Sequence, residues 1–231
     1  MAAGNGMRLR PLTDNFQKCL LPVKGRPILE WWLDAVFRSK CFDNVFVNVH
    51  HCADQVENWL YNYLIRKGSM VRIIDERVSL LGTAGTLFWH ADTSQDFMVA
   101  YTDTFSETFF GMIPACIESF RAIPEESLAG LISFNAPKDS SAGTFVADCV
   151  GNVLSFEEKK ELSDLAWAGI LFGKPKFLSQ ITDKQKDLAR DVLPKMCGKL
   201  RVISHVEAYD IGRGIDCYEK FSGTVRKTSQ R

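Results

Sequence analysis

Residues 2–30 read AAGNGMRLRPLTDNFQKCLLPVKGRPILE and combine small residues with fixed positive charge. Glycine has no side chain, so a glycine-rich turn lets backbone N–H groups approach phosphate oxygens closely. Arg8 and Lys18 add cations that can hold a polyphosphate. The stretch has neither the GKS or GKT end of a P-loop nor the GxGxxG of a dinucleotide site. It therefore predicts a phosphate-binding loop of another kind, although the glycines alone also fit a flexible N-terminus.

Short apolar segments alternate with helical ones along the rest of the chain. The expected helices lie at residues 27–37, 54–68, 109–120 and 186–196, and the expected strands at 45–49, 71–74, 97–101, 128–134, 144–148, 153–156, 168–172 and 200–206. Pro27 stands at the start of the first helix, and Asp54 is expected to cap the second, which ends at Gly68. This alternation predicts an α/β fold with a mostly parallel central sheet flanked by helices. The strands after residue 143 are close together in sequence and indicate a small mixed β region.

The composition is that of a globular protein, because 46% of the 231 residues are hydrophobic and 28 basic residues balance 28 acidic ones. A net charge near zero disfavours nucleic acid or an anionic membrane as a partner. The seven cysteines are scattered and form no CxxC pair, which disfavours a disulfide framework or a zinc site and favours a reducing cytoplasm. The sequence has neither an apolar run of transmembrane length nor the apolar core of a signal peptide.

Residues 2–30 resemble the signature of the sugar-phosphate nucleotidylyltransferases, AAGxGTRLxPLTxxxPKxLLPVxGxPxLE. These pyrophosphorylases make nucleotide sugars from an NTP and a sugar 1-phosphate. The chain departs from the pattern at Met7, where threonine is usual, and at Gln17, where proline is usual. The resemblance continues to about Phe221 and implies a single catalytic domain of the GT-A-like, Rossmann-related nucleotidyltransferase type. The expected parts are a nucleotide-binding half at residues 1–134, a sugar-phosphate-binding half at residues 135–221 and a tail at residues 222–231.

The resemblance implies that Arg8 and Lys18 hold the triphosphate and the attacking phosphate, where negative charge builds up during the reaction. The small residues of the opening turn would lie against the bound nucleotide. They are Ala2, Ala3, Gly4 and Gly6.

A second segment of small residues, LLGTAGTL at 80–87, resembles the family's LGTAG loop. By this resemblance, Gly82, Thr83 and Gly85 lie against the nucleobase, and Glu76 lies near it. The variant is most similar to mannose-1-phosphate guanylyltransferases, so guanine is the favoured base. Thymidylyl-, uridylyl- and cytidylyltransferases share the fold. A helix start capped by Thr83 is an alternative interpretation of the same residues.

Two aspartates are candidates for magnesium ligands. Asp103 follows the expected strand 97–101, and the carboxyl end of a strand is where a carboxylate can meet a bound cation. Asp210 lies in AYDIGRGIDCYEK, which resembles the family's second metal-binding segment, with Arg213 in place of threonine. The resemblance implies that Asp103 and Asp210 hold one Mg²⁺ together. A turn or a helix cap is the alternative role for a lone aspartate after a strand.

Residues 151–159, GNVLSFEEK, resemble the G-x-V-x-x-F-x-E-K segment of the family. Glu158 would accept from a sugar hydroxyl and Lys159 would hold the sugar phosphate. Gly143 and Gly169 would also belong to the sugar-phosphate side. Trp167 stands where the family carries asparagine, and would narrow the sugar pocket or accompany a loss of activity. Without the resemblance, EEKKE at residues 157–161 fits a solvated run of charges.

The resemblance therefore predicts a nucleotidyl transfer, in which a sugar 1-phosphate oxygen attacks the α-phosphorus of an NTP in line and pyrophosphate leaves. GTP and mannose 1-phosphate are the favoured pair, with Mg²⁺ as cofactor. Two alternatives stay open: another base or phosphorylated acceptor such as heptose 1-phosphate, and a non-catalytic nucleotide-sugar sensor. The departures that motivate the sensor are Met7, Thr102, Trp167 and Arg213. Neither a nucleic acid nor a membrane is an expected partner, and a homo-oligomer stays open.

The start of the chain carries one further expectation. Family members have a short apolar strand just before AAG, and Met1 stands where that strand ends. We therefore expect a chain that is shortened at its start and lacks the first strand, with unpaired backbone groups beside the loop.

Overall fold

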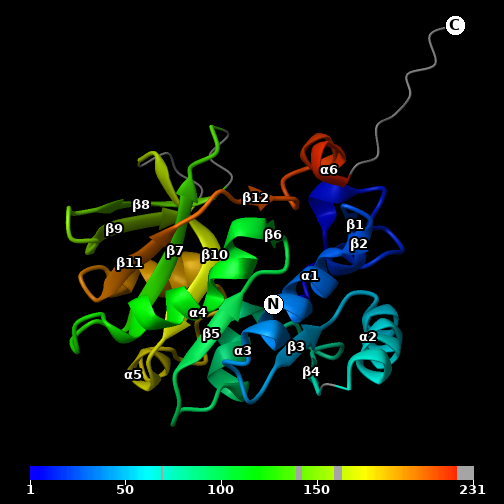
Figure 1. Ribbon diagram of the computed structural model, residues 1–231, viewed down its shortest axis with the longest axis horizontal. Coiled ribbons are helices and arrows are strands. Elements are labelled where there is room, and N and C mark those ends of the chain that lie inside the picture. The colour runs from blue at the N-terminus through cyan, green and yellow to red at the C-terminus, as the bar shows by residue number, and fades with distance from the viewer. Residues whose placement is uncertain (69, 139–141, 159–162, 223–231) are drawn as a thin grey trace, which may run out of the picture. The chain divides into compact units, whose positions relative to one another are not determined.

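The computed structural model describes residues 1–68, 70–138, 142–158 and 163–222 (Figure 1). Its contacts divide the chain into two compact units, each of which is built from separate stretches of sequence. Unit 1 contains Met1, Val78–Tyr101 and Ser106–Ala208. Unit 2 contains Ala2–Arg77, Thr102–Phe105 and the described residues from Tyr209 onward.

Unit 1 is built on a sheet that, among the described residues, has six strands in the order β11-β7-β10-β8-β9, with β5 also paired to β10. The strands are β5 (Phe97–Ala100), β7 (Ala129–Asn135), β8 (Gly143–Ala147), β9 (Val153–Glu158), β10 (Leu165–Gly173) and β11 (Leu200–His205). β7 and β11 are parallel, whereas β10 is antiparallel to β5, β7 and β8, and β8 is antiparallel to β9.

The α/β architecture is confirmed, but the strand directions in unit 1 differ from the predicted mostly parallel sheet. β8, β9 and β10 follow one another through short connections, which suit antiparallel pairs. A parallel pair needs a long crossover, and the alternation of strands and helices predicts such a pair only where a helix lies between two strands. The small mixed β region expected after residue 143 is therefore the larger part of this sheet.

The helices of unit 1 are α3 (Gly82–His90), α4 (Glu107–Arg121) and the short α5 (Pro175–Leu178). Ser106 caps α4, because its hydroxyl accepts from the Phe109 N–H at 3.1 Å. The expected helix at 186–196 is instead one π turn over Leu188–Val192 and a 3-10 turn over Leu193–Met196. Pro194 stands in the first turn of the 3-10 segment, where its missing N–H costs no hydrogen bond of that turn.

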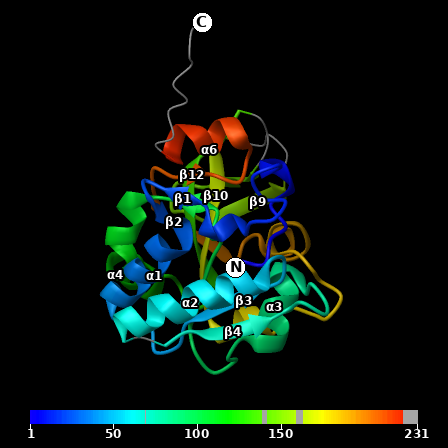
Figure 2. The same ribbon diagram turned by 90° about the vertical axis from the view of Figure 1, so that its right-hand side faces the viewer.

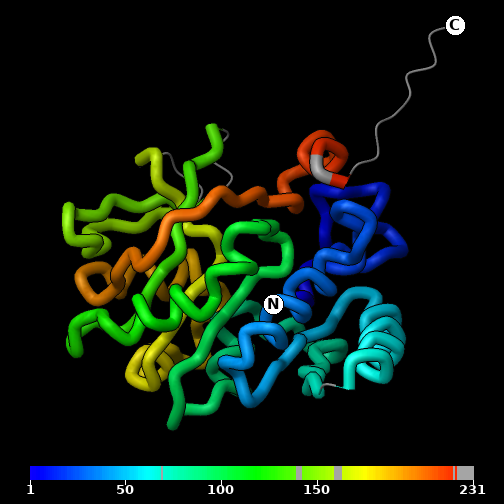
Figure 3. Tube along the Cα trace, viewed as in Figure 1, coloured from blue at the N-terminus to red at the C-terminus, as the bar shows by residue number. Residues whose placement is uncertain are grey.

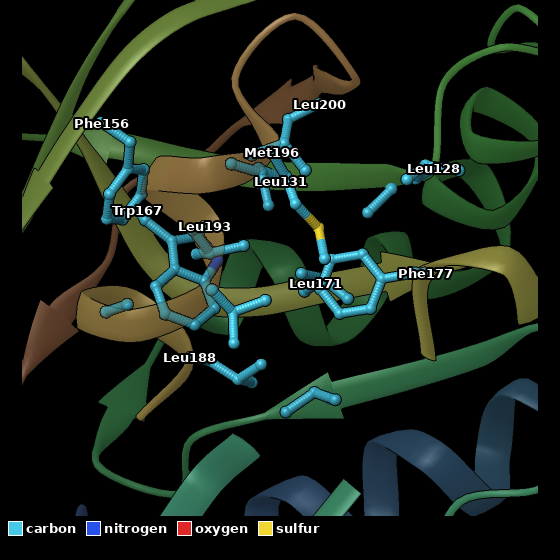
Figure 4. Close-up of a cluster of buried hydrophobic side chains, with 14 of the residues drawn as sticks. Leu128, Leu131, Phe156, Trp167, Leu171, Phe177, Leu188, Leu193, Met196 and Leu200 are labelled. Carbon is cyan, nitrogen blue, oxygen red and sulfur yellow. The ribbon is translucent and has the colours of Figure 1, made fainter. Parts of the chain in front are cut away.

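The hydrophobic core of unit 1 gathers around β10 (Figure 4). Trp167 is 5% exposed and lies among side chains that include Phe156 and Leu171. Its ring meets Tyr101 edge to face, with 5.1 Å between the ring centroids, and its Nε1 donates to the Ile170 carbonyl at 2.8 Å. The indole that sequence analysis placed on the sugar side is thus a core side chain whose polar atom has a partner.

In unit 2, strands β3 (Phe46–Val49) and β4 (Arg72–Asp75) are parallel and are joined by helix α2 (Ala53–Lys67), as the alternation predicts. Figure 2 shows α2 lying along these strands. α1 (Ile28–Ser39) contributes Leu29 and Leu33 to the core that it shares with β3 and α2. The predicted Asp54 cap is wrong, since Cys52 in the left-handed region precedes the helix and no side chain caps it.

Unit 2 also contains several shorter elements. β1 (Pro22–Val23) and β2 (Arg26–Pro27) form a hairpin, and α6 (Ile215–Ser222) follows near the end of the described chain. β6 (Thr104–Phe105) and β12 (Tyr209–Asp210) form an antiparallel pair from distant parts of the sequence, which the chain trace in Figure 3 makes visible. Within the residues that the structure describes, no helix is both long and apolar enough to cross a membrane.

Substituting Trp167 tests its position in the core of unit 1. Trp167→Ala is expected to lower the free energy of unfolding by about 3–5 kcal/mol, because the lost ring leaves a cavity. The matched control is Trp89→Ala, since Trp89 lies in the same unit but is 64% exposed, and its loss should stay near or below about 1 kcal/mol. Urea denaturation measures both. Equal losses in the two variants would contradict the core position.

Candidate functional site

Asp103 and Asp210, predicted as a pair from separate motifs, lie together in unit 2. The β6–β12 pair brings them there, since Asp210 lies opposite Thr104 and the Ile211 N–H donates to the Asp103 carbonyl at 2.9 Å. The side chains of α1 hold this pair in place. Trp32 Nε1 donates to the Thr104 carbonyl at 3.0 Å, and Trp31 meets Phe105 edge to face.

Lys18 supplies the positive charge at these carboxylates. Its Nζ donates to Asp103 Oδ2 at 2.6 Å, and the two side chains are only 16% and 19% exposed. A charged hydrogen bond of this length in a largely dry place is much stronger than an ion pair on the surface. The opening loop reaches the same ammonium, since a Cβ at Gly4 would lie 4.0 Å from Lys18 Nζ.

The two carboxyls respond differently to this environment. Burial acts to raise the pKa of Asp103, but the adjacent Lys18 ammonium outweighs it and holds this pKa below its ordinary value. Burial and the negative charge of Asp103 together raise the pKa of Asp210 to about 6. Two carboxylates held this close repel each other, so further positive charge at this place would stabilise them.

Gly212 allows the three charged side chains to converge. A Cβ at this position would lie 3.1 Å from each of Asp103 Oδ2, Asp210 Oδ1 and Lys18 Nζ. The Gly212 N–H donates to Asp210 Oδ1 at 2.8 Å. A side chain at residue 212 would therefore press on all three groups, and glycine leaves them the space to converge.

Arg8 lies in the turn over Met7–Leu9 that follows the glycines, and its side chain is exposed. Its charge is close enough to act on the pKa of both Asp103 and Asp210, lowering each. The predicted cations Arg8 and Lys18 thus both act at the carboxylate pair, one from solvent and one from a buried position. The turn is closed by Thr13, whose hydroxyl donates to the Gly6 carbonyl at 2.7 Å.

The start of the opening loop is held by Asn48 of β3, which sequence analysis did not identify. Asn48 Oδ1 accepts from the Ala2 N–H at 2.7 Å, and its Nδ2 donates to Glu76 Oε1 at 3.0 Å. Glu76 is 2% exposed at the end of β4, and Ala3 is likewise buried. The structure therefore joins Ala2 and Glu76, two predicted nucleotide-binding residues, through one buried amide.

The predicted base-binding residues Gly82, Thr83 and Gly85 lie in unit 1, at the start of α3. The Thr83 hydroxyl accepts from the Leu188 N–H at 2.9 Å, and no side chain caps α3, so the alternative of a Thr83 cap is wrong. Gly82 has a φ of +77°, and a Cβ there would collide with the Lys186 carbonyl. Close packing on residues 185–188 thus accounts for the small residues, and contact with a base stays a prediction.

The predicted sugar-phosphate residues also lie in unit 1. Gly143 of β8 is paired with Glu158 of β9, and a Cβ at Gly143 would lie 2.9 Å from Glu158 Oε2. Gly169 has a φ of +72° where β10 changes register, and its carbonyl accepts from the Tyr101 N–H at 2.9 Å. Lys159 lies outside the described residues. The roles of these residues and of Trp167 toward a sugar phosphate stay predictions.

The chemistry of Asp103 and Asp210 fits a magnesium ion. Among the described residues, no group of three or more His, Cys, Asp or Glu side chains is gathered for a metal. Mg²⁺ prefers hard oxygen ligands and is commonly held by one or two carboxylates together with substrate phosphates and water. Two crowded carboxylates beside the predicted phosphate-binding loop match this preference, and a bound cation would relieve the repulsion that raises the pKa of Asp210.

The sequence analysis missed Asn48, Gln17 and Gly212 as residues that hold the site in place. Asn48 and Gln17 are polar residues buried in unit 2, and each has a partner tens of positions away along the chain. The departure from the family pattern at Gln17 is a signal in retrospect, because it places a side chain with two hydrogen-bonding ends directly before Lys18. Gly212 could have been expected from its place two residues after Asp210.

Comparison with known proteins gives consistent results. The model of the family described as "Nucleotidyl transferase" matches residues 1–222. The chain is 27% identical to a UTP–glucose-1-phosphate uridylyltransferase of Synechocystis, covering 98% of this chain and 63% of that protein. It is 28% identical to the mannose-1-phosphate guanylyltransferase catalytic subunit beta of Drosophila melanogaster, covering 85% of this chain and 53% of that protein. The chain thus spans less than two thirds of the length of these relatives.

A solved structure shows the same fold. HddC from Yersinia pseudotuberculosis superposes with a TM-score of 0.70 over 96% of both chains, at 22% sequence identity. The fold comparison therefore agrees with the α/β architecture.

Asp210→Asn tests the electrostatic account of the carboxylate pair. Because the folded protein raises the pKa of Asp210 from 3.8 to about 6, ionised Asp210 opposes folding above pH 6. Below about pH 4 the carboxyl is protonated in both states, and this penalty disappears. In EDTA at pH 8, Asp210→Asn should therefore raise the free energy of unfolding by about 3 kcal/mol, and the gain should vanish toward pH 4.

The matched control is Asp148→Asn. The Asn152 amide and backbone N–H groups lower the pKa of Asp148, so its charge favours folding and its removal should bring no gain at pH 8. Urea denaturation across this pH range measures both variants. A loss of stability in Asp210→Asn at pH 8 would contradict the account.

Proposed function

We propose a function for this chain, which belongs to the nucleotidyl transferase family: it transfers a nucleotidyl group from an NTP to a sugar 1-phosphate and releases pyrophosphate. The observation that carries the proposal is the cluster of Lys18, Asp103 and Asp210 beside the opening loop. Such a cluster holds both positive charge for phosphate oxygens and carboxylates for a divalent cation.

In the proposed reaction, a phosphate oxygen of the sugar 1-phosphate attacks the α-phosphorus of the NTP. A new P–O bond forms as the bond between the α-phosphorus and the bridging oxygen to the β-phosphate breaks, and pyrophosphate carries away that electron pair. No covalent enzyme intermediate is needed. Since two anions must meet, the main task of the protein is to neutralise charge and to hold both reactants in line.

The residues of unit 2 suit this task. Lys18 would move its ammonium from Asp103 toward phosphate oxygens, and exposed Arg8 would hold the outer part of the triphosphate. Asp103 and Asp210 would hold Mg²⁺, which when bound supplies charge neutralisation at the phosphates. The backbone N–H groups near Gly4 would contact phosphate oxygens.

For the substrates, we propose GTP and mannose 1-phosphate as the first pair to be tested. The LLGTAGTL segment supports guanine by resemblance, and one relative is a guanylyltransferase. Another relative is a uridylyltransferase, so UTP and glucose 1-phosphate are the second pair. The seven free cysteines suit a reducing cytoplasm as the compartment.

The test is a pyrophosphate-release assay with Mg²⁺, each NTP and a panel of sugar 1-phosphates. Release that depends on one matched pair is the expected result. Asp103→Asn should lower kcat/KM by about a hundredfold or more, because it removes a cation ligand and the partner of Lys18. Asp43→Asn, at an exposed aspartate of unit 2, is the matched control and should keep full activity.

Two outcomes would contradict the proposal. Full turnover in Asp103→Asn would show that the carboxylate pair has no role in the reaction. Nucleotide-sugar binding without pyrophosphate release from any pair would identify a binding protein in place of an enzyme.

A further inference from the structure

We propose that Gln17 and Gln55 are positioning residues, which fix the backbone that carries Lys18 and so aim its ammonium at the carboxylate pair. The catalytic consequence of this inference rests on the proposed function, whereas the positioning itself does not. Both glutamines belong to unit 2, as do Lys18 and Asp103.

The side chain of Gln17 is completely buried and uses both ends of its amide. Its Oε1 accepts from the Lys18 N–H at 2.6 Å, and its Nε2 donates to the His51 carbonyl at 2.7 Å. The Gln17 side chain therefore links the backbone N–H of Lys18 to the turn that precedes α2. A buried amide of this kind is costly unless it is paired, so these bonds are needed for it to stay there.

Gln55, in the first turn of α2, holds the same segment from its other side. Its Oε1 accepts from the Gln17 N–H at 3.1 Å, and its Nε2 donates to the Asn15 carbonyl at 2.7 Å. His51 adds a third contact, because its Nε2 lies 3.1 Å from the Thr13 carbonyl, which can only accept. Residues 13–18 are thus fastened to the start of a regular helix.

The restraint matters because Lys18 reaches Asp103 through a long side chain. Its Nζ is 2.6 Å from Asp103 Oδ2, and the position of its backbone decides whether that ammonium also lies at the phosphates. A lysine side chain has four rotatable bonds and would spread over several rotamers if its backbone moved. Misplacement by a small distance can cost a large factor in rate.

The backbone conformation of residue 17 does not itself require glutamine. Gln17 has a φ of −74° and a ψ of 130°, which proline also adopts. The resembled signature carries proline at this place, and a proline ring would restrain the backbone covalently. In this chain the restraint comes from the hydrogen bonds of the two glutamines.

The experiment compares Gln17→Met and Gln55→Met with the wild-type chain. Each variant keeps the length of the side chain and removes its hydrogen bonds. Gln180→Met is the matched control, because Gln180 is an exposed glutamine of unit 1. The first readout is trace acetylation with acetic anhydride, in which peptide mass spectrometry reports the labelling of Lys18 relative to the other lysines of the same molecule.

Lys18 labelling should rise severalfold in Gln17→Met and Gln55→Met, since the ammonium leaves Asp103 more often, and should not change in Gln180→Met. In the pyrophosphate assay, kcat should fall about ten- to hundredfold in the two variants, as is common for residues that orient a catalytic group. KM for the sugar 1-phosphate should stay within about twofold of the wild-type value.

Unchanged Lys18 labelling in both folded variants would overturn the inference. The labelling needs no turnover, so it tests the positioning even if no substrate pair releases pyrophosphate. A fall in kcat that merely follows a lower melting temperature, with Lys18 labelling unchanged, would also overturn it. If Gln17→Met does not fold, Gln55→Met alone carries the same expectations, because it removes the bonds to the Gln17 N–H and the Asn15 carbonyl and leaves Gln17 in place.

Discussion

The contact between the Lys18 ammonium and the Asp103 carboxylate, with Asp210 beside it, is the interaction on which the rest of unit 2 depends. Two buried carboxylates repel each other and cost free energy to desolvate, and one ammonium offsets only part of that cost. Replacing such a buried cluster of charges with apolar side chains often leaves stability unchanged or raises it. The presence of this cluster supports the proposed site, in which a divalent cation would supply the missing positive charge.

The local structure of unit 2 is arranged around that contact. The short β6–β12 pair sets the two aspartates side by side, and Trp32 of α1 fixes its backbone. Gly212 leaves the space into which the three charged groups converge. Asn48 holds the start of the opening loop through the Ala2 N–H, and Gln17 and Gln55 hold the backbone next to Lys18.

The sequence could predict the elements and residues that depend on local patterns. α1, α2 and most strands follow from apolar periodicity and turn residues, and Lys18, Asp103 and Asp210 follow from motifs. The β6–β12 pair could not be predicted, because two-residue strands leave no pattern and their partners are a hundred residues apart. The π and 3-10 turns over residues 188–196 could not be predicted, because a proline in a helical pattern does not decide the outcome: α4 continues past Pro114. The burial of the Trp167 indole in the core could not be predicted from its motif, because that burial depends on side chains from several strands, and its role toward a sugar phosphate stays a prediction.

The most direct test of the central claim is a crystal structure of the chain with Mn²⁺ and an NTP analogue that cannot be cleaved at the α-phosphorus, with the ion located by anomalous scattering. The account predicts Mn²⁺ bonded to both Asp103 and Asp210, and triphosphate oxygens on Lys18 and Arg8. Mn²⁺ and nucleotide bound elsewhere, with the Lys18–Asp103 contact left intact, would contradict it.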